Sequence, residues 1–283
     1  KVSTPAMQLW KSSVTGRLDK DDITANIRLG DSADKARFAI NAVLQQDDSA
    51  NVLTLKEGLL LNYETWQVAQ PNKIVFGKQG VYAQDFKISK GGESISLNSS
   101  TPQYNAPLNV DITQFSIANI TEIMQKDTLL ADGILNTKLT VENLATAPSA
   151  TGTIQVKEIK VMDNPMGDLD VQLTTASANE VAAKLAITGY DNDIALNGSY
   201  YPEPNNGNNF DMNLDIKALN LKSFEGLTMG QLRNSSGYLR GKVAIKGTLQ
   251  KPQLNGELKT DNLKTTVVML GSPFTMPQER IAV

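Results

Sequence analysis

The side chains best able to carry chemistry are carboxylates in two short clusters, Asp19–Asp22 and Asp191–Asp193. Carboxylates this close together can hold Ca²⁺ in a loop. Neither cluster continues into the glycine and distal glutamate of an EF-hand, so surface turns are the better interpretation. The 283 residues include no His and no Cys, which removes thiolate nucleophiles, His or Cys metal ligands and a Ser-His-Asp relay. We therefore expect no enzyme, no catalytic residue, no metal site and no cofactor.

The charged residues are balanced and interspersed. Lys and Arg number 27 and Asp and Glu number 30, which gives a net charge of -3. Because no basic stripe is present to neutralise phosphates, nucleic acid is an unsuitable partner. Apolar residues make up 40% of the chain, a globular composition, yet their longest runs are shorter than a bilayer span. The chain starts at Lys1 without the apolar core of a signal peptide, so we expect a fragment of a longer protein.

The elements that must position any site are predicted to be strands. Apolar residues alternate with polar ones in short runs, such as Ile23–Leu29 and Leu169–Leu173, which Gly, Pro, Asn and Asp interrupt. This period of two predicts roughly fifteen to twenty strands with one buried face each. Helical spacing occurs only in Ile117–Lys126, through Ile117, Ile120 and Ile123, and Ser223–Gly226 is a possible single turn capped by Ser223. The sequence therefore predicts an all-β fold with a few short helical turns.

An internal repeat organises the strands. Sliding the chain by 104 residues superimposes identical residues without a gap: Asn109, Asp111, Ile112, Gly133, Leu135, Lys138, Pro148 and Gly152 meet Asn213, Asp215, Ile216, Gly237, Leu239, Lys242, Pro252 and Gly256. Within this pattern we expect turn geometry at Gly133 and Gly237. We predict divergent leading strands over 1–91, one repeat unit over 92–190, and a second, truncated unit over 191–283.

Repeated strands bury their apolar face only by stacking on neighbours, so they grow into an elongated array. Twenty strands at the usual spacing would extend for about 90–100 Å. The inward aliphatic side chains allow two interpretations. They either pack against each other in a closed core, which is the common case, or line an open groove that holds acyl chains.

The segment Gly237–Leu258 resembles the recurring unit G-x-L-x-G-x-(L/V)-x-(L/I)-x-G-x-x-x-x-P-x-L-x-G-x-L of the TamB family in the AsmA-like clan. Leu61–Val68 and the following Asn72–Phe76 are similar to the leading strands of the same family, particularly its Bacteroidota members. The first copy departs from the unit at Asn143, where the second copy has Gly247. The resemblance covers most of residues 50–283.

This resemblance implies a curved antiparallel or mixed β-sheet with a taco-like hydrophobic groove. Family members are anchored in the inner membrane, cross the periplasm and are implicated in moving phospholipids to the outer membrane. Some assemble outer-membrane proteins with an Omp85-type barrel, so a scaffold for that assembly is the alternative to a lipid conduit. A carbohydrate-active β-solenoid is a third possibility, which the long repeat disfavours.

The groove residues that we expect to contact phospholipid acyl chains are the inward aliphatic residues of the repeat: Val110, Ile112, Leu135, Leu139, Val141, Ile154, Val156, Ile194, Leu196, Leu214, Ile216, Leu239, Val243, Ile245, Leu254 and Leu258.

Overall fold

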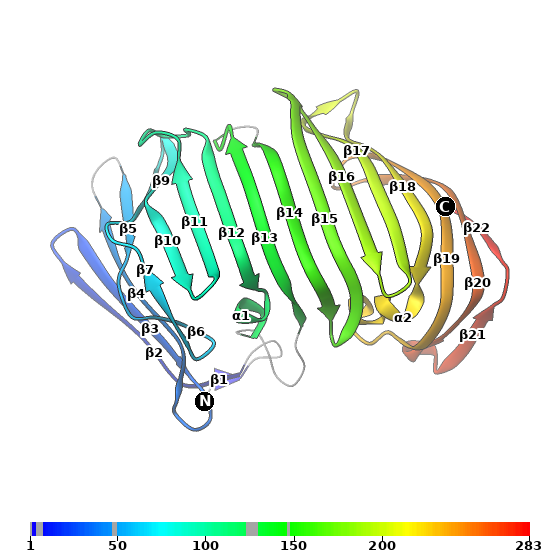
Figure 1. The fold of residues 1–283 in the computed structure, drawn as a ribbon, viewed down its shortest axis with the longest axis horizontal. Coiled ribbons are helices and arrows are strands. Elements are labelled where there is room, and N and C mark those ends of the chain that lie inside the picture. Colours follow the sequence, from blue (N-terminus) through cyan, green and yellow to red (C-terminus); the bar gives the residue numbers. More distant parts are fainter. Residues whose placement is uncertain (1, 4–7, 47–49, 123–129, 146–147) are drawn as a thin grey trace. The chain divides into compact units, whose positions relative to one another are not determined.

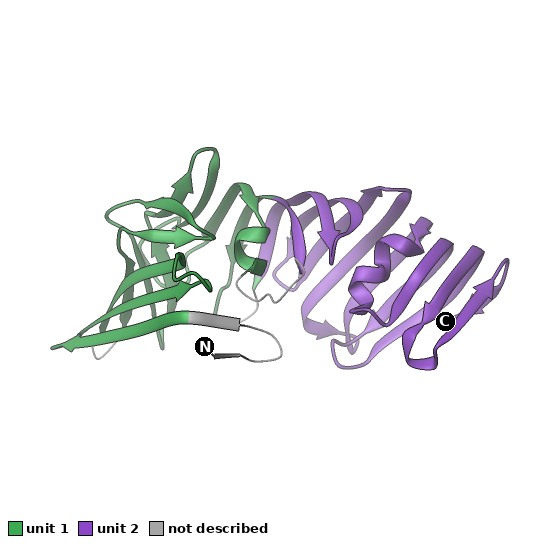
Figure 2. Ribbon diagram, turned by 90° about the horizontal axis from the view of Figure 1, so that it is seen from below, with its two compact units in different colours: residues 1–128, 135–148 green, residues 129–134, 149–283 purple. Residues whose placement is uncertain are grey.

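The computed structural model describes residues 2–3, 8–46, 50–122, 130–145 and 148–283. The chain divides into two compact units (Figure 2). Unit 1 comprises Lys1–Thr128 and Leu135–Pro148, and unit 2 comprises Leu129–Ile134 and Ser149–Val283. Both units consist almost entirely of strands (Figure 1), and every described strand pairing is antiparallel. The predicted fold class, a curved all-β sheet with a few short helical turns, is confirmed.

Unit 1 contains the shorter strands of the chain. They are β1 (Val2–Ser3), β2 (Gln8–Asp19), β3 (Asp22–Gly30), β4 (Ala36–Gln46), β5 (Asn51–Leu55), β6 (Leu59–Leu61), β7 (Glu64–Val68), β8 (Lys73–Gly77), β9 (Gly80–Gln84), β10 (Phe86–Lys90), β11 (Glu93–Ser99) and β12 (Leu108–Ser116). The short helix α1 (Ala118–Thr121) follows, and β13 (Ala131–Glu142) supplies its later residues to this unit.

The sheet of unit 1 forks at β4, which pairs with β5 near one end and with β6 near the other. One branch continues through β8 to β9, and the second continues through β7, β10 and β11 to β12. The branches meet again between β9 and β11, where the backbone N–H of Ala83 donates to the hydroxyl of Ser99 at 3.1 Å. A hydrophobic cluster of Leu59, Trp66, Ile88 and Phe115 lies within this unit.

Unit 2 is a meander of long strands that follow one another in sequence (Figure 1). They are β14 (Ser149–Val161), β15 (Asn164–Ser177), β16 (Glu180–Gly189), β17 (Asn192–Asn205), β18 (Asn208–Asn220), β19 (Leu232–Gly247), β20 (Pro252–Val267), β21 (Ser272–Met276) and β22 (Arg280–Ala282). The helix α2 (Leu221–Phe224) and the 3-10 turn η2 (Glu225–Thr228) lie between β18 and β19, and a second 3-10 turn, η3 (Val268–Leu270), lies between β20 and β21.

Three hairpins of unit 2 have two-residue turns in which both residues have positive φ: Met162 and Asp163, Tyr190 and Asp191, and Asn206 and Gly207. This is the type I′ geometry, whose twist matches that of the flanking strands. The cluster Asp191–Asp193 therefore forms a turn and the first residues of β17, as predicted. The cluster Asp19–Asp22 likewise joins β2 to β3.

The repeat reappears in the order of elements. In both copies a strand leads into a short helix and then into two long strands: β12, α1, β13 and β14 in the first, and β18, α2, β19 and β20 in the second. Because the structure does not test the predicted boundaries at 91/92 and 190/191, they stay predictions. The compact units divide elsewhere, around residues 129–149.

Two local predictions were wrong. The helix cap is Asn220, whose side chain accepts a hydrogen bond from the backbone N–H of Lys222, because α2 begins two residues before Ser223. Gly133 and Gly237 lie inside β13 and β19 rather than in turns. At Gly237 the backbone passes so close to β20 that a Cβ would lie 2.3 Å from the carbonyl oxygen of Asn262. The predicted helical residue Ile123 lies outside the described part of the chain.

Candidate functional site: the apolar face of unit 2

Strand register in unit 2 aligns aliphatic side chains into rows on one side of the sheet. Residues that face each other across neighbouring strands share a face, as do residues two apart along a strand. The central row runs across six strands through Ile154, Val171, Leu185, Leu196, Leu214 and Val243. A second row contains Val156, Leu169, Ile187, Ile194 and Ile216 and reaches Leu258 beside Gly241. A third contains Leu173, Ala183, Gly198, Met212, Ile245 and Leu254.

We call these three rows the apolar face. Only some of their side chains are fully buried, among them Ile194, Ile216 and Val243. Leu196 and Leu214, in the middle of the central row, are half-buried, and Leu254 is exposed. Because the rows contain only hydrocarbon side chains, one Met and glycines, the face offers accessible apolar surface with no side-chain donor or acceptor to satisfy.

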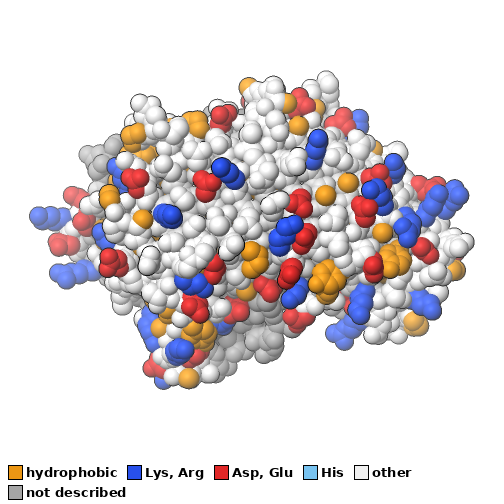
Figure 3. Space-filling model, in the orientation of Figure 1, with side chains coloured by type: hydrophobic (Ala, Val, Ile, Leu, Met, Phe, Trp, Pro, Cys, Tyr) orange, Lys and Arg blue, Asp and Glu red, His pale blue; other side chains and the backbone are white. Residues whose placement is uncertain are grey.

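The opposite side of the same strands is polar. Asp215 and Lys242 face each other across β18 and β19 and form an ion pair at 3.1 Å, and Asp211 and Lys246 pair at 3.3 Å. Figure 3 shows both signs of charge mixed over the side of unit 2 that Figure 1 presents. The sheet of unit 2 is therefore amphipathic, with one face suited to water and the other to hydrocarbon.

In one ion pair on this polar side, the pKa values of both side chains are shifted. A hydrogen bond from the backbone N–H of Glu158 at 2.9 Å, together with the Lys157 ammonium at 3.0 Å, lowers the pKa of Asp168. Asp168 in turn raises the pKa of Lys157. Both groups are largely solvated, so the ion pair contributes little to stability.

The segment α2–η2 lies against one end of this sheet and contacts β15, β18 and β19 (Figure 2). Asn192, almost fully buried, ties that end together: its Oδ1 accepts the backbone N–H of Asn220 at 2.8 Å, and its Nδ2 donates to the carbonyl of Met166 at 2.9 Å. Gly226 lies directly on the end of β14, where a Cβ would be 2.0 Å from the carbonyl oxygen of Val161. The apolar face is therefore bounded on this side by a packed segment.

The structure divides the sequence-predicted groove residues between the two units. Val110, Ile112, Leu135, Leu139 and Val141 belong to unit 1, and the remaining eleven belong to unit 2. In unit 1, Ile112 and Leu135 pack against the hydrophobic cluster around Trp66. In unit 2, ten of the eleven lie on the apolar face, while Leu239 pairs with Leu219 beyond its end.

The predicted groove residues leave out seven side chains of the apolar face: Leu169, Val171, Leu173, Ala183, Leu185, Ile187 and Met212. Their strands show the same alternation of apolar and polar residues, so the signal was present. Six of the seven lie on β15 and β16, which the repeat does not match, whereas Met212 on β18 has the apolar counterpart Leu108 and was missed despite it.

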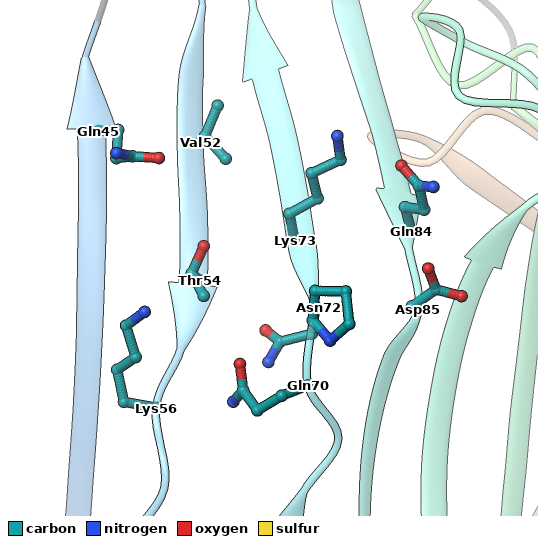
Figure 4. A pocket seen from close by; sticks show the side chains of 10 residues that line it. Gln45, Val52, Thr54, Lys56, Gln70, Asn72, Lys73, Gln84 and Asp85 are labelled. Carbon is teal, nitrogen blue, oxygen red and sulfur yellow. The ribbon is translucent and has the colours of Figure 1, made fainter.

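A hollow of about 340 Å³ lies on unit 1 and is lined mostly by residues with polar side chains (Figure 4). Its lining includes Gln45 of β4, Val52 of β5, Lys56 directly after β5, Lys73 of β8 and Gln84 of β9. Figure 4 shows these side chains spread over the surface of adjacent strands rather than converging on one point. No three acidic side chains lie close enough to hold a metal ion within the described ranges.

The sheet of unit 2 thus has one polar and one apolar face, the usual pattern of an antiparallel sheet. A sequence model of the TamB N-terminal domain matches residues 65–260, more than half of the chain, and the chain belongs to this family. No curated protein and no solved structure matches it significantly. Membership assigns the chain to the cell envelope, with a role in lipid transport or outer-membrane protein assembly and with partner proteins. Among the described residues, no helix has the length and hydrophobicity needed to span a bilayer.

Proposed function

We propose that this chain is part of a periplasmic conduit that carries phospholipids between the inner and outer membranes, with their acyl chains on the apolar face. The observation that carries the proposal is the unbroken central row, in which Leu185, Leu196 and Leu214 remain half-buried. The chain would bind and pass lipid without catalysing a reaction. In the full-length protein an inner-membrane anchor would hold one end of the conduit.

The dimensions and energetics of the apolar face support this role. From Ile154 on β14 to Val243 on β19 the central row crosses six strands, about 24 Å at the usual strand spacing. A bilayer's hydrocarbon core is about 30 Å thick, so the acyl chains of one leaflet extend for about half of that length. Each methylene moved from water onto an apolar surface contributes about 0.8 kcal/mol when fully buried. A row of this length can therefore hold a whole acyl chain.

The test is site-specific photo-crosslinking in cells. A photoreactive amino acid at Leu185, Leu196 or Leu214 is expected to capture phospholipid. The matched controls are the adjacent Lys184, Asn197 and Asn213, whose side chains lie on the polar side of the same strands and are expected to capture none. Equal labelling of the two sets would overturn the proposal.

The second candidate function is a scaffold for outer-membrane protein assembly with an Omp85-type barrel. The observation in its favour is that the described pairings of β21 and β22 use only β20, so the other side of each strand has backbone groups able to pair with an incoming strand. Capture of a nascent barrel strand at Phe274, together with no lipid at Leu196, would favour the scaffold.

A further inference from the structure

Two 3-10 turns of unit 2 come together at one end of the β19–β20 hairpin. The turn η2 precedes β19 and η3 follows β20, and the two strands are paired at these ends through Leu232 and Val267. The backbone N–H of Val268 in η3 donates to the carbonyl of Gln231, three residues after η2, at 2.9 Å. The side chains of both turns therefore belong to one surface.

That surface consists of large apolar side chains. We call it the rim patch: Leu227, Met229, Val268, Met269 and Leu270, all of them exposed. Met229 and Met269 are 77% and 81% exposed. Exposed apolar residues on a soluble protein are usually scattered singly, so a group of five is unusual. Methionine and leucine at turn tips adapt their shape to a fluid apolar partner.

The charges around the rim patch favour an anionic partner. Arg233 and Lys264 are exposed, on the paired ends of β19 and β20, and within the described ranges neither forms an ion pair. The nearest carboxylate along the chain, that of Glu225, points inward and accepts the backbone N–H of Ser235. An apolar patch beside unpaired cations resembles the side chains that insert into the headgroup region of acidic membranes.

The backbone of the patch argues against a protein strand as partner. The N–H groups of Met229, Gln231 and Gly271 donate to carbonyls within their own turns at 3.3, 3.0 and 3.1 Å. A strand partner needs free backbone donors and acceptors, which these turns do not present. We propose that the rim patch docks onto the surface of an anionic phospholipid bilayer, with Met229, Met269 and Leu270 entering the headgroup layer and Arg233 and Lys264 contacting lipid phosphates.

This inference goes beyond the proposed conduit, since a protein can dock on a membrane without carrying its lipids. The test is flotation of the purified chain with vesicles of phosphatidylglycerol and phosphatidylcholine. We expect binding that weakens at high ionic strength and in vesicles of phosphatidylcholine alone. The triple variant Met229→Ser, Met269→Ser, Leu270→Ser is expected to bind at least about tenfold more weakly. The matched control is Leu249→Ser, because Leu249 is 64% exposed at the opposite end of the same hairpin.

A second measurement reports how deeply the rim patch enters the bilayer. Tryptophan at Met269 is expected to be quenched by lipids with brominated acyl chains, while tryptophan at Leu249 is not. The proposal is overturned if the parent chain fails to float with acidic vesicles, if the triple variant binds as well as the parent, or if both tryptophans are quenched alike. Self-association of the parent that the triple variant abolishes, without vesicle binding, would assign the patch to a second copy of the chain. Photo-crosslinking at Leu196 is independent of all these outcomes.

Discussion

Trp66 is the most completely buried large side chain of unit 1. It is 1% exposed, and its ring centroid lies 5.7 Å from that of Phe115 in a tilted arrangement. Its indole N–H has no hydrogen-bond partner among the described residues. The side chain therefore contributes through packing and not through a polar contact.

We predict that Trp66→Ala lowers the free energy of unfolding by about 3–5 kcal/mol, because it leaves a cavity within the cluster of unit 1. Trp66→Phe keeps an aromatic ring beside Phe115 and loses no hydrogen bond, so its cost is expected to be clearly smaller. Urea denaturation followed by circular dichroism measures both. An alanine variant as stable as the parent would contradict this account of the core.

At the scale of elements, the α2–η2 segment is held to the sheet by close packing and by its cap. Asn220 caps α2, Asn192 links Asn220 to β15, and Gly226 lets η2 approach the end of β14. The backbone of Gly226 has an ordinary φ, so only space and not conformational strain makes glycine necessary there.

We predict that Gly226→Ala destabilises the chain by about 1–3 kcal/mol, since the new methyl group collides with the Val161 carbonyl and displaces η2. Gly16→Ala is the matched control, because a Cβ at Gly16 meets nothing within 4 Å and its φ is ordinary. It is expected to change stability by no more than about 0.5 kcal/mol. Thermal denaturation of the two variants tests this prediction. Equal melting temperatures would contradict the packing of η2 on β14.

At the scale of the whole molecule, the proposed lipid conduit requires the two sides of the unit 2 sheet to differ in polarity. Each strand contributes apolar residues to one side and polar residues to the other. Ion pairs such as Asp215–Lys242 keep the polar side in water. Nothing in the central row offers a hydrogen bond, so a charged group placed there would lie against hydrocarbon.

We predict that Leu196→Asp combined with Leu214→Asp reduces co-purified phospholipid at least about tenfold, because two carboxylates in the central row repel acyl chains. Asn197→Asp combined with Asn213→Asp adds the same charge to the polar side and is expected to leave bound lipid unchanged. Mass spectrometry of lipids extracted from each purified variant measures the difference, with circular dichroism to check folding. Equal loss in both variants would show that charge alone, and not its side of the sheet, matters.

The sequence by itself determined the all-β class and the side of each strand on which its apolar residues lie. Both are local properties, because alternation along a strand fixes the face on which each residue lies. The isoleucine spacing from Ile117 and the cap signal at Ser223 also predicted short helical turns after β12 and after β18, although the cap is Asn220, because Asn and Ser are nearly equivalent as caps.

Only the tertiary structure decided which apolar residues form a core and which remain accessible. Ile88 and Leu196 show the same alternation along the chain, yet Ile88 is buried in the Trp66 cluster while Leu196 is half-buried in the central row. The difference arises from the fork at β4, which gives unit 1 two branches around one cluster, whereas the strands of unit 2 follow one another in a single meander. Pairing between segments that are distant in the sequence does not change the local periodicity, so the sequence alone does not reveal it.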